Sequence, residues 1–169
     1  METLVKNNIL VIKQSKELWS LSDWTSGRVS IEIPVERINE VILNGSGEIR
    51  SKHTLSTTSF KTKLSGSGDI DLTVEAERVK GIVTGSGDLR LSGKAQETYF
   101  EVTGSGDIKA KNLKSDVCSG RITGSGSINL YAKVEMDSYI TGSGHINCYG
   151  KPPSHKTKVT GSGDVYFKD

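Results

Sequence analysis

The sequence predicts an all-β solenoid, a parallel β-helix of about seven coils with a non-repeating N-terminal cap. The tripeptide Gly-Ser-Gly recurs seven times, at intervals of 21, 19, 19, 20, 18 and 19 residues. A period near 20 residues is typical of repeats that cannot bury their own apolar face and must stack on their neighbours. Among the 169 residues, 19 are glycine and only 34% are hydrophobic, which favours a thin, repetitive core. The first glycines of the copies are Gly45, Gly66, Gly85, Gly104, Gly124, Gly142 and Gly161.

Residues 1–40 do not follow the period, and we expect them to form capping strands that belong to the same domain as the repeats at 41–169. Residues 8–13 are predicted to form one strand, and the alternating apolar residues of 29–35 a second. Trp19, Leu21 and Trp24 lie between these strands and are interpreted as a lid over the open end, since an uncapped sheet edge promotes aggregation. The alternative is that the two tryptophans form a platform for a sugar ring.

Each repeat carries a fixed pattern of apolar residues around its glycines. The residues two before and four after the first glycine are aliphatic in every copy, and the residue six after it is apolar in six of seven. An alternation of period two predicts a half-buried strand, so these positions and both glycines should face inward. Two inward glycines per coil indicate a corner. The predicted inward residues are Leu43, Leu64, Val83, Val102, Ile122, Ile140 and Val159, then Ile49, Ile70, Leu89, Ile108, Ile128, Ile146 and Val165, and finally Leu72, Leu91, Ala110, Leu130, Cys148 and Phe167.

The segments between the glycine strands are polar and rich in turn-forming residues, with one or two apolar anchors each. The predicted anchors are Val74, Ala76, Val79, Ala95, Leu113 and Val134. Cys118 and Cys148 fall at different positions of their repeats, so they are expected to be buried, unpaired thiols, with a disulfide as the alternative. The last strand, at residues 165–167, has nothing to stack on, and this edge could serve oligomerisation with another chain.

Charge and hydropathy exclude several classes of partner. The formal net charge is only +2, from 22 basic and 20 acidic residues, which argues against a nucleic-acid or anionic-membrane partner. No apolar run is long enough for a signal peptide or a membrane span, so the segment is expected to be soluble and not inserted in a membrane.

The outward positions should stack into columns of like side chains along the corner. Threonine and serine flank the first glycine in most copies, and an acidic residue follows three positions after it. Such an array of hydroxyls suits hydrogen bonding to a polysaccharide, and Tyr131, Tyr149 and Tyr166 could stack on sugars or pack along an edge. The candidate ligand-contact face consists of Thr84, Ser86, Asp88, Thr103, Ser105, Asp107, Thr123 and Ser125.

Stacked carboxylates repel one another, so the acidic column needs compensation. One interpretation is that the aspartates accept backbone N–H groups or pair with flanking basic side chains, namely Arg50, Arg90, Lys109 or Lys111. The alternative is a ladder of calcium ions, as in glycine-rich nonapeptide β-rolls. Two observations argue against calcium: the period here is twice as long as the nonapeptide repeat, and Ser127 and His145 interrupt the acidic column. No other cofactor is expected.

The chain is predicted not to be an enzyme. His53, His145 and His155 lack the spacing of metal ligands, and no serine has a paired His and Asp motif. Polysaccharide lyases share this architecture and need a unique acidic and basic cluster. A group such as Asp69, Asp71, Asp88 and Arg90 imitates one, but the same residue types recur in most coils.

The repeated Thr-Gly-Ser-Gly-Asp-Ile pattern, Ser-Gly-Lys-Ala at 92–95 and Tyr-Gly-Lys-Pro-Pro at 149–153 resemble the bacterial family named putative autotransporter adhesin, head GIN domain. The resemblance covers residues 29–169. It implies a right-handed parallel β-helix of the kind frequent in Bacteroidetes, exported or held at the cell envelope. The expected function is a non-catalytic, adhesin-like interaction module whose partner is a surface protein or a glycan. The alternative is a carbohydrate-binding or carbohydrate-active β-helix. The family defines no catalytic residues that could be carried over.

Overall fold

The computed structural model describes residues 2–13 and 29–168, and these residues form strands, turns and extended segments with no helix. The contacts divide the chain into two compact units, Met1–Pro34 and Val35–Asp169, which are described separately. The strands are β1 (Glu2–Lys6), β2 (Ile9–Lys13), β3 (Glu40–Gly45), β4 (Glu48–Arg50), β5 (Leu55–Gly66), β6 (Asp69–Gly85), β7 (Asp88–Gly104), β8 (Asp107–Lys114), β9 (Val117–Gly124), β10 (Ser127–Tyr131), β11 (Glu135–Gly142), β12 (His145–Tyr149), β13 (Ser154–Gly161) and β14 (Asp164–Lys168).

The first unit contains an antiparallel hairpin of β1 and β2. Its turn is made by Asn7 and Asn8, whose φ angles are 52° and 60°. Asparagine tolerates this left-handed conformation better than most residues, and a two-residue turn of this kind matches the twist of the two strands. The strand predicted at 8–13 is therefore confirmed as β2, whereas its partner β1 was not predicted.

The second strand predicted in this region, at residues 29–35, is wrong. These residues form no strand, and Val29, Ile31, Ile33 and Val35 are exposed. Pro34 offers no N–H to a ladder, so alternation of apolar side chains alone does not make this segment a strand. The predicted lid residues Trp19, Leu21 and Trp24 lie outside the described residues, and the capping role of residues 1–40 stays a prediction.

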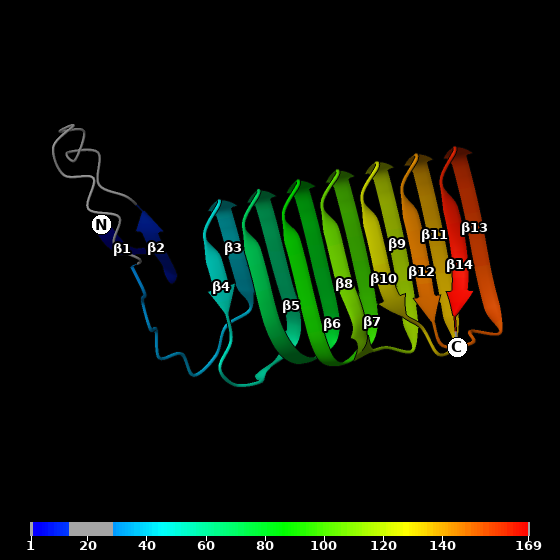
Figure 1. Ribbon diagram of the computed structural model, residues 1–169. Coiled ribbons are helices and arrows are strands. Elements are labelled where there is room, and N and C mark those ends of the chain that lie inside the picture. Colours follow the sequence, from blue (N-terminus) through cyan, green and yellow to red (C-terminus); the bar gives the residue numbers. More distant parts are fainter. Residues whose placement is uncertain (1, 14–28, 169) are drawn as a thin grey trace, which may run out of the picture. The chain divides into compact units, whose positions relative to one another are not determined.

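The second unit is a β-solenoid of seven coils whose strands pair in parallel (Figure 1). The register aligns every Gly-Ser-Gly with the next one, so that Gly85 lies beside Gly66 and Gly104, and Gly142 beside Gly124 and Gly161. The sheet order β13-β11-β9-β7-β8-β10-β12-β14 shows that β7 joins two faces, one built from β9, β11 and β13 and the other from β8, β10, β12 and β14. The predicted in-register stacking of coils is confirmed.

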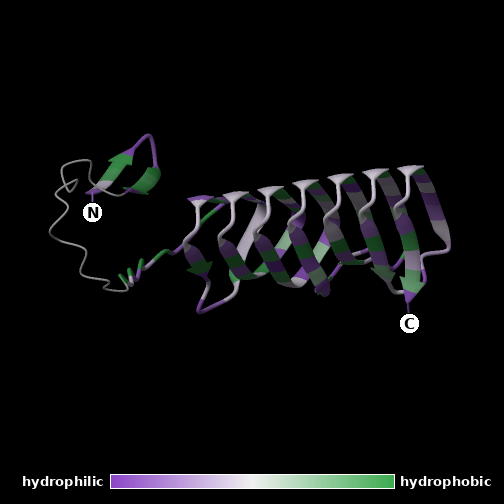
Figure 2. Ribbon diagram, turned by 45° about the horizontal axis from the view of Figure 1, so that its top comes forward, coloured by the Kyte–Doolittle hydropathy of each residue, from purple (hydrophilic) through white to green (hydrophobic). Residues whose placement is uncertain are grey.

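The corner predicted from the paired glycines is also confirmed. At Gly104 the φ angle is 116°, a conformation that favours glycine, and the strand ends there and resumes at Asp107. The backbone N–H groups of Ser105 and Gly106 both donate to the carbonyl oxygen of Gly85 in the preceding coil, at 2.9 Å. The hydrogen-bonded ladder therefore continues around the corner, and Figure 2 shows the corners as a row of neutral hydropathy.

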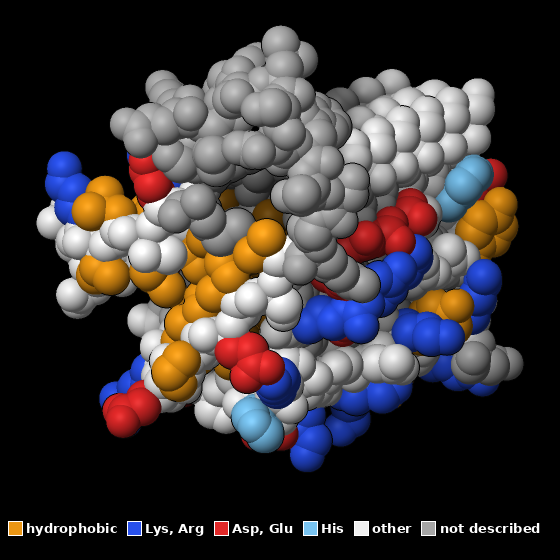
Figure 3. Space-filling view, turned by 60° about the vertical axis from the view of Figure 1, so that its left-hand side comes forward, with side chains coloured by type: hydrophobic (Ala, Val, Ile, Leu, Met, Phe, Trp, Pro, Cys, Tyr) orange, Lys and Arg blue, Asp and Glu red, His pale blue; other side chains and the backbone are white. Residues whose placement is uncertain are grey.

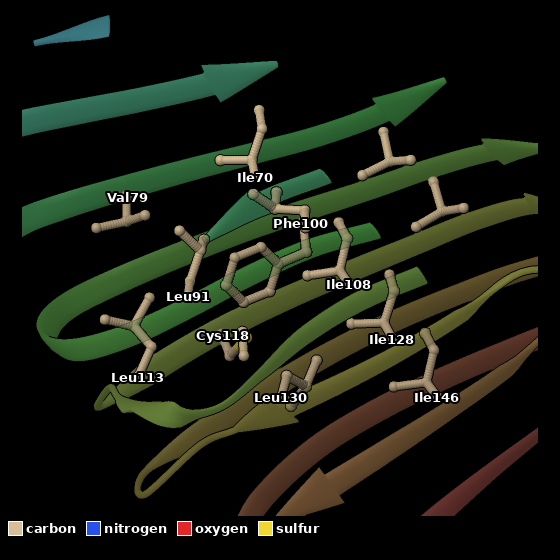
Figure 4. Close-up of a cluster of buried hydrophobic side chains, with 14 of the residues drawn as sticks. Ile70, Val79, Leu91, Phe100, Ile108, Leu113, Cys118, Ile128, Leu130 and Ile146 are labelled. Atoms are coloured by element: carbon tan, nitrogen blue, oxygen red, sulfur yellow. The ribbon is translucent and has the colours of Figure 1, made fainter. Parts of the chain in front are cut away.

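The core consists of the residues that the alternation predicts to face inward. In the inner coils the three predicted columns are buried, including Val83, Ile108 and Leu130. Figure 4 shows Ile108 and Leu130 in this core. Val159 and Phe167 of the last coil were predicted to face the core but are 40% and 46% exposed, because no further coil covers them. The predicted anchor Val134 is wrong as well, with 46% of its surface exposed in a turn.

A column of unequal residues fills the centre of the stack. Phe100 is buried, and the residues aligned with it in the adjacent coils are Gly81 and Gly120. A Cβ atom added at Gly81 would lie 2.9 Å from Cδ2 of Leu89 and 3.1 Å from the Phe100 ring, so these side chains occupy space that Gly81 leaves open. At Gly120 the space is occupied instead by Leu130, Ile146 and Ile128. A large residue between two small ones keeps the packing density even. Elsewhere in the core, columns of similar residues have the same effect.

Cys118 and Cys148 are free and buried, as predicted, and we expect them to be unreactive in the folded protein. Burial raises the pKa of Cys118 to about 12 and that of Cys148 to about 11, from an ordinary value of 9.0. A thiol-specific disulfide reagent at pH 8 should therefore modify neither cysteine until denaturant is added, since the thiolate is the nucleophile. Rapid modification of the native protein would contradict the burial.

The same two thiols should make the protein less stable at alkaline pH. Because the folded-state pKa values are raised, the neutral thiols stabilise the fold fully below pH 9, and this contribution is lost as pH rises above 9 and the unfolded chain ionises. For each protein, the fall in melting temperature is measured from pH 7 to alkaline pH. This fall should be smaller in the double variant Cys118→Ala/Cys148→Ala than in the wild type. An equal loss in both proteins would contradict the assignment to the thiols.

Among the described residues, no helix has the length and apolar character needed to cross a membrane.

Candidate functional site

The corners carry the candidate ligand-contact face, and the structure brings its predicted residues together. The threonine column is in register along the stack, as shown by the alignment of Thr84, Thr103 and Thr123. These threonines and the serines that follow the first glycines are exposed, whereas Asp88 and Asp107 are half-buried. We call this surface the hydroxyl face, and it consists of Thr84, Ser86, Thr103, Ser105, Thr123 and Ser125.

The acidic column borders the hydroxyl face, and basic side chains lie next to it (Figure 3). Asp88 pairs with Arg90 at 3.0 Å and with Lys109 at 2.5 Å, and Arg90 also reaches Asp69 at 3.7 Å. These pairs connect three successive coils. They agree with the interpretation that flanking basic residues compensate the stacked carboxylates.

Asp107 is compensated differently, because Ser127 takes the place of an acid in the next coil. The backbone N–H and the hydroxyl of Ser127 both donate to Oδ1 of Asp107, at 3.0 and 2.8 Å. One carboxylate therefore receives two hydrogen bonds instead of a like charge. The serine at position 127 thus stabilises the acidic column, because it donates hydrogen bonds where an acid would repel Asp107.

The calcium ladder finds no set of ligands in residues 2–13 and 29–168. No three His, Cys, Asp or Glu side chains lie close enough there to hold a metal ion together. Calcium takes six to eight oxygen ligands, while each coil offers one carboxylate to the column. Asp88 and Asp107 instead direct their oxygens to ammonium, guanidinium, N–H and hydroxyl groups.

Three of the four residues that imitate a lyase cluster come together as ion pairs, and no ion pair is seen for Asp71 among the described residues. Asp69, Asp88 and Arg90 form one network in which the guanidinium bridges two carboxylates. A guanidinium held in this way serves a structural role, and arginine does not lose its proton in proteins. Two of the three predicted histidines lie near aromatic rings: His145 lies 6.1 Å from Tyr166 and His155 lies 4.7 Å from Phe167, between ring centroids.

The three tyrosines singled out in the sequence take different positions. Tyr166 is exposed on the last strand, where its hydroxyl donates to Asp164 at 3.2 Å. Tyr131 and Tyr149 are aligned in adjacent coils and line a hollow of about 520 Å³. We call this hollow the basic groove, and it is lined by Lys111, Asn112, Lys114, Tyr131, Tyr149, Gly150 and Lys151. Lys111 was expected to pair with the acidic column but lies near the Tyr149 ring in this groove, and Lys114 and Lys151 were not identified from the sequence.

The backbone beneath the basic groove is held in place from within the core. The buried hydroxyl of Ser115 donates to the carbonyl oxygen of Tyr131 at 2.6 Å, and Oγ of Ser115 also lies 3.2 Å from the hydroxyl of Thr98. Gly150 has a φ angle of 97°, and a Cβ there would lie 2.5 Å from the Ala132 carbonyl oxygen and 3.3 Å from the Tyr131 ring. A glycine is therefore needed where the chain passes Tyr131.

Comparison with known proteins gives one family and several similar structures. A family model described as "Putative auto-transporter adhesin, head GIN domain" matches residues 1–152. A structure titled as a putative adhesin from Bacteroides fragilis is 25% identical, with a TM-score of 0.86 over 99% of this chain and 76% of that one.

Two structures from Parabacteroides distasonis are also similar. One, titled as a putative lipid binding protein, is 27% identical with a TM-score of 0.76 over 79% of this chain and 55% of that one. The other, titled as a putative adhesin, is 26% identical with a TM-score of 0.66 over 77% of this chain and 56% of that one. The chain thus spans little more than half the length of these two structures. Among curated proteins, none matches the sequence.

Proposed function

Because the chain belongs to the putative auto-transporter adhesin, head GIN domain family, we propose that it is a non-catalytic recognition module at the cell surface or envelope. Similar structures titled as putative adhesins support this proposal. The ion pairs that Arg90 makes with Asp69 and Asp88, in a group that resembles a lyase site, support a role without catalysis. The partner is a surface protein or a glycan.

The observation that carries the proposal is the hydroxyl face. Threonine and serine hydroxyls repeat there once per coil, at about 4.8 Å, the spacing of adjacent strands. Each hydroxyl both donates and accepts hydrogen bonds, so the face suits a partner that presents many polar groups. Because the backbone at the corners is hydrogen-bonded between coils, the face should lose little conformational entropy on binding.

The test is binding of the purified chain to a panel of immobilised glycans, envelope proteins and lipid vesicles. Lipid is included because one similar structure is titled as a putative lipid binding protein. The triple variant Thr84→Val/Thr103→Val/Thr123→Val keeps the shape of the side chains but removes their hydroxyls. We expect it to lose about tenfold or more in affinity, the effect of about 1.4 kcal/mol.

A matched control removes three exposed hydroxyls from β5, away from the corners, in the variant Ser56→Ala/Thr58→Val/Ser59→Ala. This control should bind as the wild type does. Equal binding by the corner variant and the wild type, or no binding to any member of the panel, would contradict the proposal. Protein-specific signals separate an adhesin for proteins from the carbohydrate-binding alternative, which requires saccharide-specific signals.

A further inference from the structure

We propose that the basic groove binds an acidic oligosaccharide, whose anionic groups pair with lysines that the rings of Tyr131 and Tyr149 hold in place. This site is separate from the hydroxyl face and goes beyond the function proposed above. It is built from β8, β10 and β12 and the turn that follows β12.

Charge is the first observation that supports this ligand. Lys111 and Lys114 line the groove together with Lys151, and among the described residues of its lining none is acidic. By contrast, Lys61 and Lys109 pair with acids, Glu40 and Asp88 respectively. The whole chain has a net charge of only +2, so the groove concentrates positive charge on a nearly neutral protein.

The tyrosine rings hold the ammonium groups in place. Nζ of Lys114 lies 3.7 Å from the centroid of the Tyr131 ring, and Nζ of Lys111 and Lys168 lie 5.7 and 6.0 Å from that of Tyr149. A cation over an aromatic ring is attracted to it but keeps its full charge, unlike one paired with a carboxylate. These lysines can therefore form charge-assisted hydrogen bonds with a carboxylate or sulfate of a ligand.

The shape favours a chain of sugars over a single small anion. A second hollow of about 310 Å³ is lined by Gly150, Lys151, Pro152, His155, Phe167 and Lys168, so it shares Gly150 and Lys151 with the basic groove. Both volumes fall in the range of ligand sites. Tyr131 and Tyr149 are aligned one coil apart, and Phe167 and Lys168 belong to the next coil, so successive coils present ring and charge to successive units of a linear ligand.

The ligand class is tested by calorimetric titration of the purified chain with defined probes. The acidic probes are an oligogalacturonate hexamer and a heparin-derived hexasaccharide, and the other probes are neutral maltohexaose, inorganic phosphate and phosphatidylglycerol vesicles. At least one acidic hexasaccharide should bind, and its affinity should fall as salt is raised from about 50 to about 500 mM, since charge pairing is screened. Maltohexaose should bind at least about tenfold more weakly.

Variants locate the site. Lys111→Gln/Lys114→Gln should weaken acidic-oligosaccharide binding about tenfold or more, and Tyr131→Leu should also weaken it. The control Lys63→Gln/Lys80→Gln removes the same charge elsewhere, including a lysine that lies 4.8 Å from the Tyr99 ring, and should bind as the wild type does. The corner variant Thr84→Val/Thr103→Val/Thr123→Val should also bind normally, which separates this site from the hydroxyl face. Melting curves of each variant verify folding.

Four results would overturn the proposal. They are the absence of binding to both acidic hexasaccharides, equal binding of maltohexaose, binding of phosphate as tight as that of the hexasaccharides, and equal losses in the groove and control variants. Binding of the vesicles alone would assign the groove to an anionic membrane surface and would likewise overturn it.

Discussion

Ile108→Asp is expected to unfold the solenoid or to lower its free energy of unfolding by about 5 kcal/mol or more, which is most of the stability of an ordinary domain. Ile108 is fully buried in the middle coils, aligned with Leu89 on one side and Ile128 on the other. A carboxylate there would be surrounded by aliphatic side chains with no cation in reach, so it must be buried unpaired or protonated. Chemical denaturation followed by circular dichroism measures the loss.

The matched control is Lys109→Asn, one residue further along the same strand. Lys109 faces outward, and the residue aligned with it in the next coil is Asn129. The substitution removes the ion pair with Asp88, which is partly exposed to solvent and therefore stabilises the fold by about 1 kcal/mol or less. Similar losses in the two variants would show that the inward and outward positions are wrongly assigned.

Gly106→Ala is expected to cost about 3 kcal/mol, because a single methyl group would prevent the close approach of two corners. A Cβ at Gly106 would lie 2.5 Å from the carbonyl oxygen of Gly87 and 2.8 Å from Cγ1 of Val83. The first of these atoms belongs to the backbone and is fixed by the hydrogen bonds of the corner. The neighbouring coil must therefore shift, and we expect a clear fall in the melting temperature.

Gly47→Ala is the control for this effect, because it makes the same change at the same position of the first coil. No earlier Gly-Ser-Gly corner lies against Gly47, and an added Cβ would meet only Cδ1 of Leu43 at 3.6 Å, an ordinary contact. The stability should change by about 0.5 kcal/mol or less. Equal effects at both glycines would mean that backbone freedom, and not contact between coils, explains the second glycine of the repeat.

The inner coils could be predicted from the sequence because their structure is set by one repeated environment. Ile108 and Ile128 are aligned, and each lies between apolar residues of the two adjacent coils. Apolar character therefore recurs at this position in each repeat. The register of adjacent coils could be predicted for the same reason, because only in-register stacking places glycine against glycine at every corner.

The ends of the stack could not be predicted in this way. Val159 and Phe167 satisfy the repeat pattern, but burial also requires a following coil, which a pattern within one repeat does not reveal. Similarly, residues 29–35 alternate as a strand does, but a strand needs a hydrogen-bonding neighbour. The Phe100 ring packs against Gly81 of the preceding coil, and no single repeat contains that information.

The hydroxyl face could be predicted from the sequence repeat, whereas the basic groove could not. The hydroxyl face could be found because its residues stand directly beside the glycines. Lys111 and Lys114 lie in a segment where the register of β7 and β8 shifts after Arg90, so counting from the glycine does not align them. One signal was available, since Tyr131 and Tyr149 stand at the same distance after the glycines of their repeats.

In-register stacking of the coils is tested most directly by nuclear magnetic resonance, through scalar couplings across hydrogen bonds. The structure predicts couplings from the amide nitrogen of Ser105 to the carbonyl carbon of Gly85, and from that of Ser125 to Gly104. The same link should appear between each corner and the preceding one. Couplings that instead join neighbouring Gly-Ser-Gly segments in antiparallel pairs, or that skip a coil, would contradict the stacked register on which both proposed surfaces depend.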